Sequence, residues 1–213
     1  VYAHSKGTIA KLRLTLPPGE EKTSHAPSYA MWELHEPKPV KSIVGILAAD
    51  ERSLAAARDA LAASLGGFDL LSEAWAFTDT AYYVDELGPE PLRQFVSIEQ
   101  LVHPGSLADT KHRTNAIERE LADRLATGLP RPVNLDPGLI EPSKLVLAST
   151  KNFAHRIYIG RQMYAEVTLV FDKGRWRPLP YTFPDYHRPE YFDFLSRVRE
   201  RLVQQWRSQA GRA

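Results

Sequence analysis

Side chains that could do chemistry are concentrated between residues 133 and 170, where they are interleaved with apolar, strand-like runs. The first group is Asn134 and Asp136, followed directly by Pro137-Gly138. Because proline–glycine pairs are typical of tight turns, we predict a turn here. Asn134 and Asp136 then share one face of the extended chain before it. Asp136 has three candidate roles: a base, a metal ligand, or an acceptor that bonds the backbone of its own turn.

A second group follows an expected chain break at Lys151-Asn152. It consists of His155 and Arg156 at the start of the next predicted strand, and of Glu166 on the strand after it. Adjacent strand residues face opposite sides, so one of His155 and Arg156 shares a face with Glu166. Lysine, arginine and histidine converging with Asn134 would suit a phosphate or carboxylate group. A carboxylate–histidine pair would suit acid–base chemistry. The structural alternatives are a salt bridge at Arg156 and a hydrogen-bonded core histidine at His155.

A predicted helix over residues 106–126 brings polar groups from elsewhere in the chain. Ser106, with Asp109 three residues later, fits a capping box at its start. The apolar stripe of this helix turns polar in its N-terminal half. The polar residues on or beside the stripe are Lys111, Thr114, Asn115 and Glu118. Unpaired burial costs about 1–3 kcal/mol per polar group. This half of the helix therefore has polar partners or a ligand, or it extends past the sheet edge into water.

Together these residues define one candidate site. His155 and Asp136 are the candidates for proton transfer. The candidates for holding an anionic ligand are Lys111, Asn115, Asn134, Lys151 and Arg156. Glu118 and Glu166 would orient the bases or bind a divalent metal ion. The seven histidines form no His-x-His or His-x-x-x-His pair, although Asp136, His155 and Glu166 could still converge on a metal ion through the fold. The sequence identifies no cofactor, and a divalent metal ion is the one candidate.

The elements that must position these residues follow a mixed strand and helix pattern. The expected order is strand 40–48, helix 51–65, strand 68–77, strand 92–101, helix 106–126 and the sheet stretch 133–170. Strand–helix–strand–strand–helix–strand is the order of a ferredoxin-like split βαβ unit. A β-hairpin over residues 164–179 and a C-terminal amphipathic helix over residues 190–207 extend this core. The predicted fold class is therefore α+β.

We expect residues 37–208 to form a single α+β domain and residues 209–213 to form a flexible tail. Residues 1–36 are rich in turn formers and charges. Such a composition buries too little surface to offset the entropy of ordering. We therefore predict that residues 1–36 are a disordered or mis-called N-terminal extension. Met31 is the expected true start, and residues 1–30 are expected to be poorly ordered.

The bulk composition limits the classes of function. A net charge of +1 gives no general attraction to nucleic acid or to acidic membranes. The chain has no cysteine, which excludes thiolate metal sites and cysteine nucleophiles and suits a cytoplasmic location. No apolar run reaches the roughly 20 residues that span a bilayer. The sequence also lacks the phosphate loop, the dinucleotide-binding glycine pattern and the serine-hydrolase elbow.

Several separate segments resemble one known family, the bacterial domain-of-unknown-function family 4416. The resemblance covers about residues 37–207. Its motifs are Pro37-Lys-Pro-Val40, Phe77-Thr-Asp79, Tyr82-Tyr83, Glu86-Leu-Gly88, Asn134-Leu-Asp-Pro-Gly138, Lys144-Leu-Val-Leu-Ala-Ser-Thr-Lys151, His155-Arg-Ile-Tyr158, Tyr164-Ala-Glu166 and Pro184-Asp-Tyr186. Family members are often labelled GTP-binding protein. The resemblance implies a start near Met31 but no established activity, and this chain lacks the phosphate loop that the label would require.

The leading hypothesis is a protein that binds a phosphorylated or otherwise anionic small molecule such as a nucleotide. Whether it also transforms that molecule, and so is an enzyme, is left open by the sequence. The alternative is a non-catalytic protein-interaction or scaffold module, with a homodimer formed through its sheet or aromatic loop. A third hypothesis is nucleic-acid binding through the arginine-rich C-terminal helix, which the net charge disfavours. No membrane partner is expected.

Overall fold

The computed structural model describes residues 34–79 and 83–211, and its central element is strand β1 (Val40–Ala48). Every residue of β1 is buried. The strand pairs with β4 (Leu92–Val102) along one edge and with β5 (Val133–Glu141) along the other. A strand covered on both faces has a nearly continuous apolar sequence, and the bounds predicted for this one are confirmed.

Within the described residues the sheet has nine strands, and all pairings are antiparallel. The order across it is β2-β4-β1-β5-β6-β8-β7, with β3 paired to β4 and β9 paired to β8. The other strands are β2 (Phe68–Leu71), β3 (Trp75–Ala76), β6 (Lys144–Ser149), β7 (Ile157–Gly160), β8 (Met163–Asp172) and β9 (Arg175–Pro178). The α+β class is confirmed, while the ferredoxin-like label stays a prediction.

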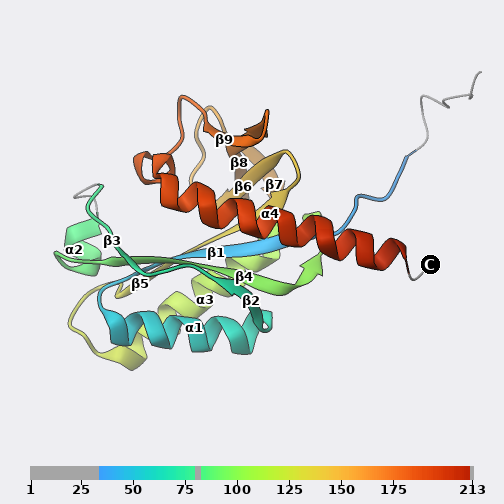
Figure 1. Cartoon of the computed structure of the whole chain (residues 1–213). Helices are drawn as coiled ribbons and strands as arrows, with labels where there is room; N and C mark the ends of the chain where they lie inside the picture. The colour runs from blue at the N-terminus through green and yellow to red at the C-terminus, as the bar shows by residue number, and fades with distance from the viewer. Residues whose placement is uncertain (1–33, 80–82, 212–213) are drawn as a thin grey trace, which may run out of the picture. The chain divides into compact units, whose positions relative to one another are not determined.

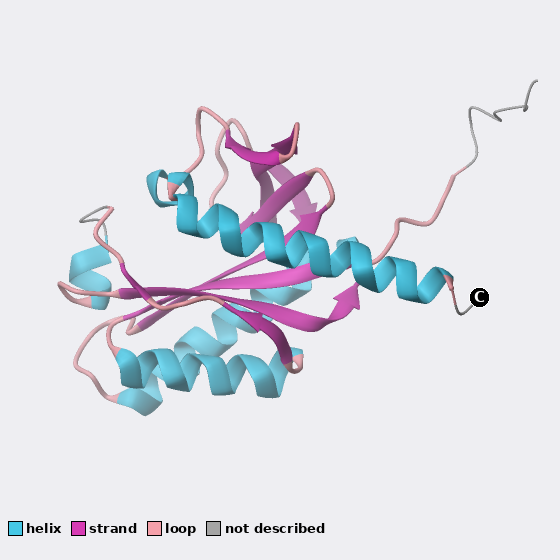
Figure 2. Cartoon of the chain, in the orientation of Figure 1, coloured by secondary structure: helices cyan, strands magenta, loops and turns pink. Residues whose placement is uncertain are grey.

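Helices cover both faces of the sheet (Figures 1 and 2). Helices α1 (Glu51–Leu65) and α3 (Leu107–Leu125) lie on one face, and α4 (Pro189–Ala210) crosses the other. Each face has its own apolar core cluster. Leu54, Leu121 and Leu135 belong to the first cluster, and Phe95, Tyr191 and Phe194 belong to the second. In the described part of the chain, the connections include a short helix, α2 (Val84–Leu87), and 3-10 turns at Pro104–Ser106 and Pro184–His187.

Helix α1 begins and ends at the residues that its sequence indicated. The Oδ1 atom of Asp50 accepts a hydrogen bond from the backbone N–H of Ser53 at 2.7 Å. This bond satisfies one of the donors that every helix start leaves open. The helix ends at Gly66, whose φ of 104° lies in the region that favours glycine. Leu54, Ala57 and Leu61 form the buried stripe of this helix.

The capping box predicted for α3 is wrong. Among the described residues, the side chain of Ser106 makes no capping hydrogen bond. The reason is that a 3-10 turn precedes the helix, and His103 Nδ1 accepts the hydrogen bond from Gly105 N within that turn. Asp109 instead forms an ion pair with Arg161, in the turn between β7 and β8.

The turn predicted at Pro137-Gly138 is also wrong, because both residues lie inside β5. Pro137 pairs with Val44 of β1, whereas β6 joins the other edge of β5 only from Gly138 onward. Proline is tolerated in a strand where its missing N–H would have faced an open edge. Gly138 is needed because β6 passes very close to it. A Cβ atom at this position would lie 2.6 Å from Leu147 Cδ2 and 2.8 Å from the Val146 carbonyl oxygen.

The predicted element bounds differ from the structure in three further places. The strand expected over residues 68–77 is two short strands, β2 and β3, both paired to β4. His155 and Arg156 precede β7 instead of lying within it. Helix α4 continues to Ala210, so the predicted tail does not begin at residue 209.

The predictions for residues 1–33, including Met31 as the start, lie outside the described residues. No helix in the described part of the chain is long and apolar enough to cross a bilayer.

Replacing Gly138 by alanine should destabilise the protein, because the new methyl group would meet the β6 backbone. Forcing an extra methyl group into a packed core costs about 1–3 kcal/mol. Gly67→Ala is the matched control, since the nearest atom to its Cβ is Glu99 Oε2 at 3.7 Å. Urea unfolding should show a lower midpoint for Gly138→Ala and a change within about 0.5 kcal/mol for Gly67→Ala. Equal midpoints for the two variants would contradict the close approach of β6 to Gly138.

Candidate functional site

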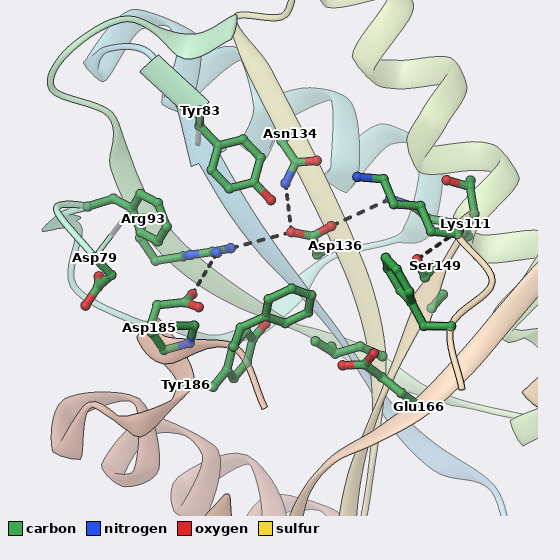
Figure 3. A pocket seen from close by; sticks show the side chains of 18 of the residues that line it. Asp79, Tyr83, Arg93, Lys111, Asn134, Asp136, Ser149, Glu166, Asp185 and Tyr186 are labelled. Carbon is green, nitrogen blue, oxygen red and sulfur yellow. Dashed lines mark hydrogen bonds and ion pairs between the residues drawn. The ribbon is translucent and has the colours of Figure 1, made fainter. Parts of the chain in front are cut away.

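A cavity of about 800 Å³ lies where β5 and β6 separate, next to the 3-10 turn Pro184–His187 that precedes α4. Strand residues Arg93, Asn134 and Asp136 line it from the sheet, and Lys111 lines it from α3. The last residue of β6, Ser149, and the two residues that follow it line another side. Figure 3 shows the side chains of Arg93, Lys111, Asn134, Asp136 and Ser149 around a common space. A cavity of this volume is within the usual range for small-molecule sites.

The cavity exists because one edge of β5 has no strand partner over residues 133–137 in the described chain. Side chains of α3 form hydrogen bonds with the unpaired backbone groups of this edge instead. Lys111 Nζ donates to the Leu135 carbonyl oxygen at 2.7 Å, and Glu118 Oε1 accepts from the Leu135 N–H at 2.7 Å. Lys111 and Glu118 are seven residues apart, which places them two turns apart on one helix face. The polar half of the predicted stripe therefore has protein partners.

Asp136 occupies the floor of the cavity, and 28% of its side chain is exposed, which is more than for the neighbouring Arg93 and Lys111. Its Oδ2 accepts a hydrogen bond from Asn134 Nδ2 at 2.7 Å. Lys111 Nζ lies 3.7 Å from Oδ1, and Arg93 Nη1 lies 3.8 Å from Oδ2 (Figure 3). Both cations thus face Asp136 at distances longer than a hydrogen bond. Burial, followed by the charge of Asp136, raises the pKa of the Tyr83 hydroxyl to about 12, so this hydroxyl is protonated at neutral pH.

Arg131 connects the two ends of this polar network. Its guanidinium donates to Glu118 Oε2 at 2.6 and 3.0 Å, to Asn134 Oδ1, and to Glu86 Oε2 at 3.4 Å. Burial raises the pKa of the Glu118 carboxyl, and the charges of Lys111 and Arg131 act against that rise. Asn134 is held at both ends of its amide, by Arg131 and by Asp136, so it fixes the orientation of the Asp136 carboxylate.

Arg93 is the most deeply buried cation in the cavity wall, with a side-chain exposure of 3%. Its guanidinium lies 5.2 to 6.0 Å from the ring centroids of Phe77, Phe95 and Tyr186. Its Nη2 donates to Asp185 Oδ2 at 2.9 Å, while Nε and Nη1 make no hydrogen bond with any described residue. Burial disfavours the charged guanidinium, but Asp185, Tyr186 and Asp136 outweigh it, so the pKa of Arg93 is raised.

Glu166 organises the opposite wall. Its carboxylate accepts from Arg156 Nε at 2.7 Å and lies 3.2 Å from His155 Nε2. Arg156 also donates to Ser149 Oγ at 2.7 Å and to the Lys151 carbonyl oxygen at 3.0 Å. The prediction that Glu166 lies near His155 or Arg156 is confirmed, and it holds for both residues. The predicted alternation of these two residues along a strand is wrong, because both precede β7.

Six of the nine predicted site residues line the cavity: Lys111, Asn134, Asp136, Lys151, Arg156 and Glu166. Glu118 lies behind Lys111 and bonds the β5 backbone. His155 and Asn115 are absent from the cavity lining. In the part of the chain that the structure describes, no group of three or more His, Asp or Glu residues is arranged to hold a metal ion. Glu118 and Glu166 each contact a different arginine, Arg131 and Arg156 respectively.

Sequence reasoning missed four residues that shape the cavity: Tyr83, Arg93, Arg131 and Asp185. Tyr83 and Asp185 lie in segments that carried the family resemblance, so those segments were the available signal. Arg93 stands two residues before Phe95 in a predicted strand, which places a charge on the same face as a core aromatic residue. That pattern was the available signal for a buried arginine.

The described chain is an α+β protein with a charged cavity beside an open sheet edge. Residues 38–202 match the family model described as Domain of unknown function (DUF4416), so the chain belongs to this family. Neither the curated proteins nor the solved structures include a significant match to it.

Glu118→Ala should destabilise the protein strongly, because it removes a buried acid that contacts both Lys111 and Arg131 and removes the acceptor of the Leu135 N–H. Breaking a buried ion pair from one side costs about 3–5 kcal/mol. Glu120→Ala is the matched control, since Glu120 is exposed and contacts only Arg124 at 3.5 Å among the described ion pairs. Urea unfolding measures both variants. Equal losses would contradict the role of Glu118 in closing the β5 edge.

Proposed function

We propose that the cavity binds a small anionic molecule that carries a phosphate or carboxylate group, and that Arg93 receives this group. The observation that carries the proposal is the state of the Arg93 guanidinium. It is almost fully buried in the cavity wall, yet Nε and Nη1 have no hydrogen-bond partner among the described residues. Buried polar groups in folded proteins are nearly always bonded, so these donors indicate a site for an acceptor from outside the chain.

The donor arrangement, and not the net charge, favours an oxyanion. The cavity lining contains five cations and five acids, so their formal charges cancel: Arg93, Lys111, Arg131, Lys151 and Arg156 against Asp79, Glu86, Asp136, Glu166 and Asp185. A guanidinium has five N–H donors in a planar fork that fits two oxygens of one acid group. Asp185 uses one end of the Arg93 fork. The end that faces Asp136 is then positioned for a ligand oxygen.

The remaining polar groups support distinct roles. Lys111 adds a second buried cation, 3.7 Å from Asp136. Asp136 is the group positioned to accept a hydrogen bond or a proton from the ligand, because its carboxylate is partly exposed at the cavity floor. Lys151 is exposed at the rim, where its charge would attract an approaching anion. Arg156 is held by Glu166 and Ser149, so we assign it to the shape of the wall.

A non-catalytic interaction module is the second candidate, and one observation favours it. Strand β7 is an outer strand of the sheet, and its residues Ile157, Tyr158 and Ile159 are 73%, 57% and 36% exposed. An exposed apolar edge strand is suited to pairing with another chain, including a second copy. Nucleic-acid binding through the arginines of helix α4 is less favoured than either candidate. Arg199 donates to the Pro142 carbonyl oxygen and Arg201 donates to Asp69, so both are already bonded within the domain.

Calorimetric titration of the 213-residue chain tests the anion proposal. The probes are inorganic phosphate, ribose 5-phosphate, succinate and purine nucleoside 5′-monophosphates. At least one should bind, and Arg93→Lys should weaken that binding about tenfold or more, since a hydrogen bond to a charged group contributes about 1.5–3 kcal/mol. Lys151→Met should also weaken it, through loss of an attracting charge.

The matched control is Lys173→Met, which removes a lysine from the exposed β8–β9 turn. It should leave the affinity unchanged. Thermal unfolding of each variant shows whether it is folded. Absence of binding by every probe to folded wild-type protein would overturn the proposal. Unchanged affinity in both Arg93→Lys and Lys151→Met would overturn it as well.

A further inference from the structure

We infer that the ligand of this cavity is an acid joined to a planar aromatic ring, with the acid group at the floor and the ring at the mouth. This inference rests on the proposed function and names its ligand class. It starts from the composition of the lining. Five of the 21 lining residues are aromatic, namely Phe77, Tyr83, Phe153, Phe183 and Tyr186. Aromatic residues make up 10% of the whole chain, so they are enriched about twofold around the cavity.

In this cavity two cations are buried and two aromatic residues are exposed, which is the reverse of the usual distribution. The cations Arg93 and Lys111 are only 3% and 5% exposed, whereas Phe153 and Phe183 are 53% and 43% exposed. Folding alone places aromatic rings inside and cations in water. Exposed apolar groups gathered at a concave site mark a surface that another molecule covers. A ligand that enters with its acid group first and leaves its ring at the mouth would bury both phenylalanines.

Phe153 is held in a fixed plane before any ligand binds. Its ring is nearly parallel to that of His155, at 5.9 Å and 10°, and His155 is nearly parallel to Tyr181, at 4.2 Å and 11°. His155 is fixed in turn by Glu166, at 3.2 Å. A ring held in place loses little conformational freedom when it contacts a ligand. This arrangement makes His155 a positioning residue that acts through Phe153, without contact to the ligand.

The guanidinium of Arg156 lies 4.8 Å from the centroid of the Phe153 ring and is bonded to Glu166 and Ser149. The mouth therefore combines aromatic rings with a fixed cation, a combination that stacks planar electron-rich rings. The cavity volume of about 800 Å³ accommodates both an acid group and a ring. A nucleoside phosphate and a simpler aryl acid share this chemistry, and matched pairs of probes distinguish them.

The test compares probes that differ only in the ring. Calorimetry on the whole chain measures purine nucleoside 5′-monophosphate against ribose 5-phosphate, and phenyl phosphate against inorganic phosphate. Stacking on an aromatic side chain contributes about 1–3 kcal/mol, which corresponds to a gain in affinity of roughly tenfold or more for the ring-bearing probe. This gain should disappear in Phe153→Leu and decrease in Phe183→Leu.

Tyr158→Leu is the matched control, because Tyr158 is equally exposed but lies outside the cavity lining. It should preserve the gain. A gain for the nucleotide and for phenyl phosphate alike assigns the site to aryl acids in general, and a gain for the nucleotide alone assigns it to nucleotides. Equal binding of both members of each pair overturns this inference and leaves the anion proposal intact. A gain that survives both phenylalanine replacements also overturns it. Absence of binding by all four probes overturns this inference, and absence of succinate binding as well overturns the anion proposal itself.

Discussion

The open edge of β5 is the constraint on which the rest of the cavity depends. An unpaired strand edge presents backbone donors and acceptors that must find partners. Over residues 133–137 no strand of the described chain supplies them. Pro137 removes one donor. Lys111 of α3 donates to the Leu135 carbonyl oxygen, and Glu118 of α3 accepts from the Leu135 N–H. Because β6 leaves at this point, a space opens beside Asn134 and Asp136, which β5 directs toward it. The cavity is thus a consequence of where strand pairing stops.

The same arrangement explains why charged groups are buried here. Glu118 holds Lys111 and Arg131, Arg131 holds Asn134, and Asn134 orients Asp136. Each acid in this network of bonded residues has a basic or amide partner, so the network offsets much of the free-energy cost of burying charge. Arg93 differs from these residues, because two of its buried nitrogens have no hydrogen-bond partner among the described residues. The site therefore has more hydrogen-bond donors than acceptors, although its formal charges nearly cancel. This excess of donors favours a ligand whose oxygen atoms accept hydrogen bonds.

Much of this site was predictable from local patterns, and the remainder depended on contacts between distant residues. Strand alternation correctly put Asn134 and Asp136 on one face, and helix periodicity correctly put Lys111 and Glu118 on a core-facing stripe. The Pro137-Gly138 turn was mispredicted because turn propensity is local, whereas the pairing of β5 with β1 joins residues far apart in sequence. Arg93 was missed for a related reason. Its role arises from Asp185, which lies 92 residues later, and no local pattern specifies that contact.

The most direct test of the account is the side-chain resonance of Arg93 in a proton–nitrogen NMR titration with inorganic phosphate. The Nε–H signal is assigned by its loss in Arg93→Lys, and the exposed Arg175 provides an internal reference. The account predicts a saturable shift of the Arg93 signal, with the dissociation constant found by calorimetry, and no shift for Arg175. Phosphate binding that leaves the Arg93 signal unchanged would contradict the claim that this buried guanidinium receives the acidic group.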